Sequence, residues 1–534
     1  MGTDALVARF VLRIARRGAL IWAAVVFVSV ASSIKSFDSL YPDLADRLKL
    51  ATSLESNTGF AALLGVPRHL ETTGGFIAWR IGVLLTVILS IWALLLASRV
   101  LRGEEDAGRW ETLATASRST PALTRAAIGA VAIACLAPFL GGALGAFAVV
   151  SGTEMSVADI CWFMLGVTLC ALSFATFTAF ASQLFAPRAR VSTVAAIALA
   201  VAYLVRLVAD SETRFGWLRW CSPLGWLEEL HAFTGTRPVV LLLYVAWILA
   251  FGAAAVALAG RRDVGAAVFA TQGARHSRAL RFGNPFVDAF RFVRGSVIGW
   301  TAGASIGAFE LGLLAPSAAK AVRESDFASR FGGALGGNIG AAAGYLGATF
   351  VFVIATLVAI SPSSHLASAR DEEESGRIET FLAGITSRRA WLWSRVGVAF
   401  VNAVAVAAGA AVFGWLGVRV AGENIGVGHL FAATLCYVPL AVAFGGLALA
   451  VFGVAPRATQ GLVATLVGIA ALIEVIGSLA DAPSWFLDLS PFFHLGNAPA
   501  EPARPGPAIA MFVFGAACAV FGVEAFARRD LTPM

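Results

Sequence analysis

The sequence is poor in charged residues. Asp, Glu, Lys and Arg make up 14% of its 534 residues, against about a quarter in a soluble globular protein. Lysine is especially scarce, since only Lys35, Lys49 and Lys320 occur. None of them stands in the Gly-x-x-x-x-Gly-Lys-Ser/Thr pattern whose backbone N–H groups and lysine hold nucleotide phosphates. The sequence therefore predicts neither an ATPase nor a catalytic residue on this chain.

Cysteine is also sparse, and its spacing is irregular. No Cys-x-x-Cys pair and no metal-ligand spacing occurs among Cys135, Cys161, Cys170, Cys221, Cys436 and Cys518. All but Cys221 lie inside apolar blocks, where a thiol behaves as a small apolar side chain. We therefore expect neither a disulfide framework nor a metal site.

Long apolar blocks are what the sequence has in abundance. Hydrophobic residues make up 58% of the chain, and many blocks reach the ~20 helical residues that cross the hydrocarbon core of a bilayer. Continuous apolar runs indicate helices, because a helix satisfies its own backbone in lipid. We predict an all-α polytopic membrane protein with about twelve spans, near 18 to 34, 75 to 98, 126 to 150, 158 to 184, 191 to 209, 238 to 259, 296 to 315, 339 to 361, 396 to 418, 428 to 453, 459 to 479 and 507 to 526.

The chain contains a hidden duplication. Most landmarks recur about 268 residues further on, which is the signature of an internal repeat. The matching landmarks are Arg13 and Trp22 with Arg291 and Trp300, Gly108-Arg109-x-Glu111-Thr112 with Gly376-Arg377-x-Glu379-Thr380, Ala186-Pro187-Arg188-Ala189 with Ala455-Pro456-Arg457-Ala458, Trp217 and Ser222-Pro223 with Trp485 and Ser490-Pro491, and Arg261-Arg262-Asp263 with Arg528-Arg529-Asp530.

The duplication predicts two six-helix halves. Residues 1–263 form the first half, 264–290 a basic linker with the start of an interfacial helix, and 291–534 the second half. Residues 4 to 17 place apolar side chains on one face and arginines around the other, as in a helix that lies in the membrane interface. An ordinary solvated helix is the alternative. Since six is even, the two halves are expected to be related by an axis along the membrane normal.

Basic residues gather in alternate loops. The loops on the side of the N-terminus hold roughly twice as many Lys and Arg as the others, and this bias marks the cytoplasmic side. We therefore expect a multi-pass protein of the bacterial cytoplasmic membrane with both termini in the cytoplasm. The same bias explains the net charge of +7, so nucleic acid is not an expected partner.

The loop after the second span of each half carries a charged, helix-compatible element. An acidic cluster is followed by Gly, Arg, an apolar residue and Glu, which suits the docking of a short rod into the groove of a partner protein. A solvated turn is the alternative, and the recurrence in both halves favours docking. The residues concerned are Glu104, Glu105, Gly108, Arg109, Glu111, Glu372, Glu373, Gly376, Arg377 and Glu379.

A few charges lie inside the predicted spans, where they are costly and indicate function or pairing. Arg206 and Glu474 occupy nearly corresponding places in the two halves. They are candidates either for a structural ion pair or for part of a pathway for polar cargo, and Arg206 also lies close enough to a span end to reach the surface. Glu310 is a further candidate.

Two segments outside the spans are rich in aromatic residues. Trp217 to Phe233 and Trp485 to His494 have the composition of short re-entrant or interfacial helices that close the external mouth of a pathway. An ordinary aromatic belt at headgroup depth is the alternative. A metal role for His231 or His494 is not expected, because neither has a partner at ligand spacing.

The chain resembles the ABC-2 family of exporter permeases. The resemblance covers nearly the whole chain, and it is carried by the interfacial helix, the Glu-Glu-x-x-Gly-Arg-x-Glu element, the Ser-Pro segment before span six and the Arg-Arg-Asp that ends each half. The fused arrangement is similar to that of actinobacterial polyketide antibiotic exporters of the tetronasin type.

This resemblance implies a permease whose charged elements are coupling helices for ATPase subunits. The partners would be two copies of a nucleotide-binding ATPase, which carry ATP and Mg, together with membrane lipids and an amphipathic small molecule as cargo. The alternative is an ion-coupled secondary transporter, which can also have twelve helices in two parallel halves. A membrane enzyme is a weaker alternative, because no cluster of His, Asp and Glu converges on one face.

Overall fold

The computed structural model describes residues 3–55, 61, 64–116, 119–150, 155–211, 213–269, 284–324, 341–374, 376–383, 386–456, 458–479, 484–496, 498–500 and 504–530. All regular secondary structure in these ranges is helical. The chain divides into two compact units, Met1–Ser277 and Arg278–Met534. The boundary between them falls within the predicted linker at 264–290.

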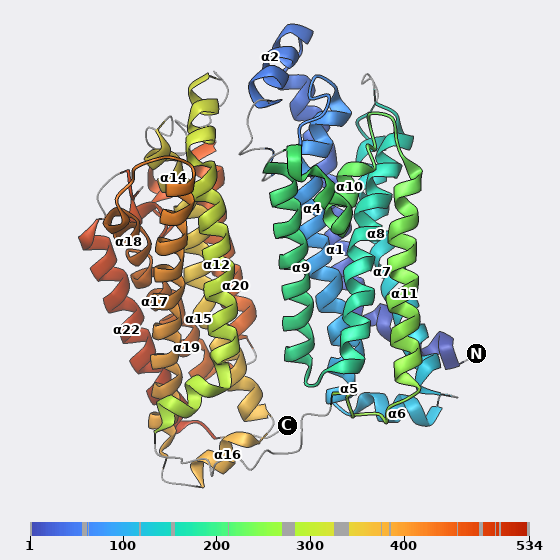
Figure 1. Cartoon of the computed structure of the whole chain (residues 1–534). Helices are drawn as coiled ribbons and strands as arrows, with labels where there is room; N and C mark the ends of the chain where they lie inside the picture. The colour runs from blue at the N-terminus through green and yellow to red at the C-terminus, as the bar shows by residue number, and fades with distance from the viewer. Residues whose placement is uncertain are drawn as a thin grey trace. The chain divides into compact units, whose positions relative to one another are not determined.

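The first unit is a bundle of long helices joined by short ones (Figure 1). Its elements are α1 (Thr3–Leu40), α2 (Leu44–Glu55), α4 (Thr73–Ser98), the π-helix η1 (Arg99–Gly103), α5 (Glu104–Asp106), α6 (Arg109–Ala116), α7 (Thr120–Phe147), α8 (Val157–Leu184), α9 (Arg188–Ser211), the 3-10 helix η2 (Thr213–Cys221), α10 (Pro223–Glu229), η3 (Pro238–Val240) and α11 (Leu241–Ala259).

The second unit repeats this plan (Figure 1). Its elements are α12 (Pro285–Glu324), α14 (Ala342–Thr349), the π-helix η4 (Phe350–Ile354), α15 (Ala355–Glu374), α16 (Arg377–Leu382), α17 (Arg388–Val420), α18 (Val427–Leu435), α19 (Val438–Val454), α20 (Thr459–Leu479), α21 (Ser484–Leu487), the 3-10 helix η5 (Phe493–Leu495) and α22 (Pro505–Arg528).

Eleven helices within the described ranges are long and apolar enough to cross a membrane, six in the first unit and five in the second. The remaining predicted span, 459 to 479, coincides with α20. The predicted all-α polytopic class is therefore confirmed, whereas the parallel relation between the two halves stays a prediction.

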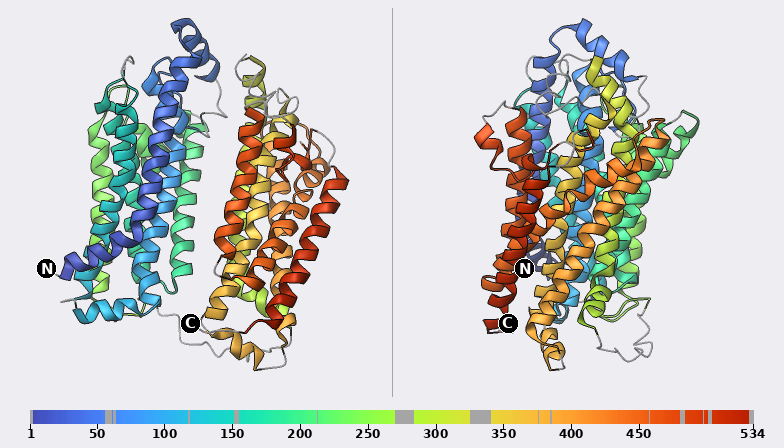
Figure 2. Two further views of the ribbon diagram at one scale, coloured as in Figure 1. Left: turned by 180° about the vertical axis from the view of Figure 1, so that it is seen from behind. Right: turned by 90° about the vertical axis from the view of Figure 1, so that its left-hand side faces the viewer.

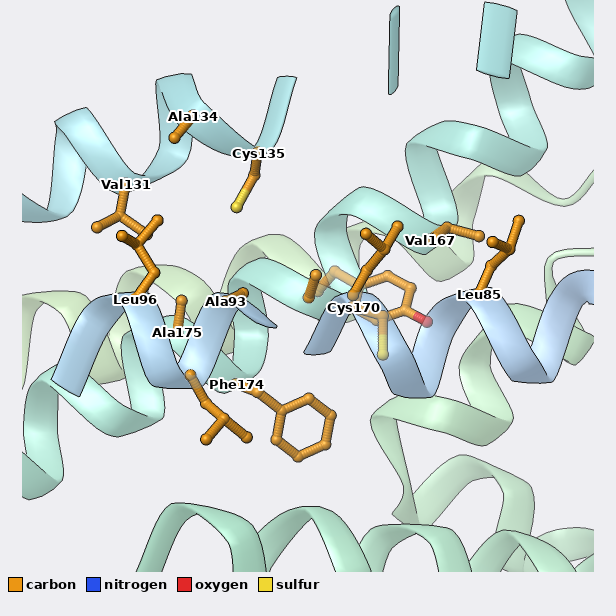
Figure 3. Close-up of a cluster of buried hydrophobic side chains, with 14 of the residues drawn as sticks. Leu85, Ala93, Leu96, Val131, Ala134, Cys135, Val167, Cys170, Phe174 and Ala175 are labelled. Atoms are coloured by element: carbon orange, nitrogen blue, oxygen red, sulfur yellow. The ribbon is translucent and has the colours of Figure 1, made fainter. Parts of the chain in front are cut away.

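The core of the first unit lies between its long helices. Figure 3 shows Leu85 of α4, Val131 of α7 and Val167 of α8 in one buried apolar cluster. Small residues let the helices approach closely, since a Cβ on Gly141 of α7 would lie 2.2 Å from the carbonyl oxygen of Ala23. Such contacts replace the hydrophobic drive that helices lack inside a bilayer.

The first helix of each half differs from the expected pair of elements. The predicted interfacial helix and the first span form one continuous helix, α1, of 38 residues, and α12 is likewise continuous over 40 residues. Neither the junction at Gly18 nor the one near Gly295 holds a proline that would end a helix. In Figure 2 the first turns of α1 run away from the direction of the rest of the helix.

Candidate functional site

The charged element of the first unit follows α4 directly and consists of η1, α5 and α6. It lies at one end of the unit, which we call the basal end, opposite the end that holds α10 (Figure 1). Glu104 and Glu105 are buried, whereas Arg109 and Glu111 are exposed. The element therefore has an inner acidic face and an outer mixed face.

Glu105 is the centre of the inner face. Its carboxylate forms an ion pair with Arg262, and both side chains are at most 4% exposed. A second guanidinium nitrogen of Arg262 donates to Glu105 at 2.9 Å, and the backbone N–H of Gly265 donates to the same carboxylate at 2.7 Å. The element is thus fastened to the Arg-Arg-Asp segment that follows α11.

Arg102 of η1 reinforces this attachment. It donates to Asp106 at 2.8 Å and to the backbone carbonyls of Gly265 and Ala266 at 2.9 and 3.0 Å. Because a buried charge is stable only when it is paired and hydrogen-bonded, these contacts explain how a guanidinium can be almost fully buried here. We call Arg102, Glu105 and Arg262 the basal clamp of the first unit.

Two further residues set the shape of the element. Gly108 has a φ of +72°, a left-handed conformation that glycine adopts without strain, and it turns the chain between α5 and α6. Trp110 is 3% exposed, and its indole N–H donates to the carbonyl of Val100 at 3.0 Å. The apolar residue of the motif therefore anchors α6 inward and is not free to contact a partner.

The second unit repeats the clamp. Glu373 pairs with Arg529, the counterparts of Glu105 and Arg262, and Glu372 pairs with Arg395 of α17. Gly376 has a φ of +69° and Ile378, the counterpart of Trp110, is 1% exposed. Glu379 is exposed, and the side chain of Arg377 lies outside the described residues. We call Glu373 and Arg529 the basal clamp of the second unit.

Sequence reasoning found the motif, including Arg109, which pairs with Glu104, but it missed the partners of Glu105, Glu372 and Glu373. Arg102, Arg262, Arg395 and Arg529 were not predicted as site residues. The signal that could have identified two of them was present, because Arg262 and Arg529 belong to a landmark that recurs together with the acidic element.

A second charged site lies at the opposite end of the first unit. Arg206 of α9 is fully buried, 3.6 Å from Asp210 and 3.4 Å from Glu228 of α10. Arg219 of η2 contacts Asp210 at 2.6 Å and Glu228 at 3.5 Å. The network continues through Glu229, which lies 3.6 Å from Arg68 and 3.8 Å from Arg237. These contacts fasten α10 to α9 and to the loop before α4.

The surroundings of the network shift two pKa values. Burial, and then repulsion by Asp210, raises the pKa of Glu228 to about 8, although Arg206 and Arg219 oppose the shift. Burial, and then the charge of Arg68, lowers the pKa of His231 to about 4. Both groups follow the span that ends at Asp210 and precede the one that begins at Pro238.

Arg206 therefore has counter-ions within its own half. The predicted pairing with Glu474 stays a prediction, because the side chain of Glu474 lies outside the described residues. Glu310 is partly buried on α12, and its role in a pathway also stays a prediction.

The aromatic segments form short helices that are built alike in the two units. Ser222 donates to the carbonyl of Ala202 at 2.7 Å, and Ser490 donates to the carbonyl of Ala470 at 2.9 Å. Trp217 and Trp485 are similarly exposed. The repeat read from the sequence is therefore also a repeat of side-chain contacts.

These features define a multi-pass α-helical membrane protein with two similarly built halves. Residues 282–527 match the family model of the multidrug efflux system permease Rv1217c, C-terminal domain. Over 98% of its length the chain is 30% identical to the multidrug efflux system permease protein Rv1217c of Mycobacterium tuberculosis, of which it covers 94%. The chain belongs to this family of multidrug efflux system permeases.

Proposed function

We propose that the chain is the transmembrane subunit of an ATP-driven ABC exporter of the ABC-2 type. It moves amphipathic, antibiotic-like or drug-like molecules out of the cell, and both of its termini lie in the cytoplasm. The observation that carries the proposal is the repeated basal element, which is clamped internally and exposed externally at matching positions of both units.

The basal clamp explains how such an element transmits force. Glu105 joins α5 to Arg262, which follows the last helix of the unit, so a push on α6 reaches both α4 and α11. A loosely attached loop would absorb the same movement. The buried ion pairs make the element rigid. Arg109 is exposed but paired with the buried Glu104, so the exposed carboxylates Glu111 and Glu379 are the charges left for a partner surface.

The partners in this proposal are two ATPase subunits that bring ATP and Mg. The absence of a phosphate-binding loop from the sequence requires a separate ATPase, and the two elements give one docking position for each copy. The name of the Mycobacterium tuberculosis relative, a multidrug efflux system permease, supports export of small molecules.

Reconstituted vesicles test the energy source. The chain is purified with and without its ATPase partner, and uptake of a lipophilic dye is measured with ATP or with a proton gradient alone. We expect transport only with both the ATPase and ATP. Transport driven by the gradient in the absence of any ATPase would instead establish an ion-coupled transporter.

The exposed acids test the docking surface. Glu111→Lys with Glu379→Lys reverses a charge on each outer face and is expected to lower ATPase co-purification at least tenfold, because like charges at an interface cost several kcal/mol. The control is Glu423→Lys, which reverses a partly exposed carboxylate elsewhere in the second unit. Equal recovery of the ATPase with the double variant would remove these faces from the interface.

A further inference from the structure

The second unit contains an apolar pocket. It lies between α19, α20, α22 and the segment of α21 and η5, and its volume is about 680 Å³. Phe444, Leu466, Ile469 and Phe514 are among the lining residues. The volume falls in the range of ligand pockets in proteins.

The repeat shows what occupies the corresponding positions in the first unit. His494, Met511 and Phe514 of the pocket correspond to Trp226, Tyr244 and Trp247. These three aromatic side chains pack on one another, with ring centroids 5.1 Å apart for Trp226 and Tyr244 and 6.0 Å apart for Trp226 and Trp247.

The pocket is therefore a property of the side chains of the second unit. In the first unit, Tyr244 is fully buried and Trp226 is 7% exposed. The same arrangement of helices can thus be closed by three large rings, so the backbone does not impose the pocket. An apolar void loses packing contacts that a filled core would make, and a ligand that enters it would restore them.

One carboxylate lies at the mouth of the pocket. Asp488 is the only Asp, Glu, Lys or Arg among the lining residues, and its side chain is exposed. Its position in the first unit is taken by Trp220. The imidazole Nε2 of His494 lies 3.0 Å from the backbone oxygen of Asp488 and not against its carboxylate. A negative charge beside an apolar chamber favours a positive group attached to an apolar body and disfavours acidic lipid headgroups.

We propose that this pocket binds a lipophilic cation of small-molecule size. Its apolar body packs against Phe444, Leu466 and Phe514, and its positive group lies near Asp488. The proposed binding depends only on residues of the second unit. That the bound cation is cargo rests on the proposed exporter function.

The test measures binding without the ATPase, so that it does not depend on transport. The whole chain in nanodiscs is titrated with rhodamine 6G, a lipophilic cation, and fluorescence polarisation is corrected for dye taken up by empty nanodiscs. His494→Trp with Met511→Tyr restores two of the rings of the first unit and is expected to weaken binding at least tenfold. Asp488→Asn is expected to weaken it about tenfold, the effect of one charge-assisted contact.

Two controls keep the result specific. Val513→Trp adds the same indole to α22 at an exposed position outside the pocket, and Glu423→Gln removes a carboxylate elsewhere in the second unit. Both should bind the dye as the parent chain does. The neutral dye Nile red should bind equally to the parent and to Asp488→Asn, because it has no charge to pair.

Other outcomes overturn the proposal in distinct ways. Unchanged affinity in the filled variant, at an unchanged thermal midpoint, would exclude the pocket as the site. Unchanged affinity in Asp488→Asn would reject the cationic class, and loss of a co-purified phospholipid from the filled variant alone would assign the pocket to lipid. Binding as expected without ATP-driven dye transport would refute the exporter function and leave the binding site intact.

Discussion

Some carboxylates of the repeated element are buried and others are exposed, so we expect their substitution to change stability by different amounts. The Glu105 side chain is 2% exposed and paired with Arg262, whereas Glu111 is exposed. Glu105→Gln leaves a buried guanidinium without its counter-charge, and we expect it to cost about 3 kcal/mol of stability. Thermal unfolding in detergent should show a lower midpoint, with Glu111→Gln within about 0.5 kcal/mol of the parent.

The matching pair in the second unit gives an internal check. Glu373→Gln should lower the midpoint in the same way, because Glu373 holds Arg529 as Glu105 holds Arg262. If Glu105→Gln and Glu111→Gln unfolded at the same temperature, the ion pair would contribute nothing to stability and the clamp would have no mechanical basis.

The sequence identified these residues but not which way each of them faces. The acidic cluster, the glycine and the following arginine were found because they recur, yet burial of Glu105 depends on Arg262, which lies far along the chain. The motif around Glu105 does not show that Arg262 will pair with it, since only the folded structure brings these two segments together. Gly108 was likewise found as part of the motif, and its positive φ supplies the reason for a glycine.

At the scale of single elements, α10 carries a carboxyl, that of Glu228, whose protonation and contacts depend on pH. The pKa of Glu228 is raised to about 8, so the folded chain holds this proton more tightly than the unfolded chain, where the usual value is about 4.5. The stabilising contribution is complete below the unfolded value and is lost as the pH rises through about 8. Stability of the first unit should therefore fall between pH 6.5 and 8.5.

Glu228→Gln should flatten this slope, because the amide does not titrate. The pH range of this test starts at 6.5 because of His231, whose folded pKa is lowered to about 4. Above pH 6.5 this histidine is mostly neutral in the folded and in the unfolded chain, so it adds little to the slope. Glu229→Gln, a change to the neighbouring carboxyl of α10, is the matched control and should keep the slope. A slope that is equally steep in Glu228→Gln would assign the pH dependence to another group.

The helical spans could be predicted more fully than their ends. Apolar length alone located the eleven candidate spans found in the described ranges. The continuity of α1 was missed, because an amphipathic segment and an apolar one can form a single helix when no proline or cap separates them. The pathway role given to Arg206 could not be separated from pairing. Asp210 lies one helical turn further along α9 and was within reach of sequence reasoning, but Glu228 is brought to Arg206 only by tertiary structure.

At the scale of the whole molecule, the two units are alike at one end and different at the other. The basal ends are alike, since both units clamp their charged element to the segment after their last helix. Among the residues that the structure describes, the opposite ends differ, because the first unit has the Arg206 network and three packed rings while the second has an apolar pocket. Under the proposed exporter function, the similar basal ends suit the docking of two copies of one ATPase, and the different opposite ends suit an asymmetric cargo.

The equal basal ends predict the composition of the assembly. If each unit provides one docking element, native mass spectrometry of the complex should give two ATPase copies per chain. Glu111→Lys alone or Glu379→Lys alone should shift the dominant species to one copy, and the double variant should leave the chain without ATPase. A single copy on the parent chain, or loss of both copies with either single variant, would contradict independent docking at the two elements.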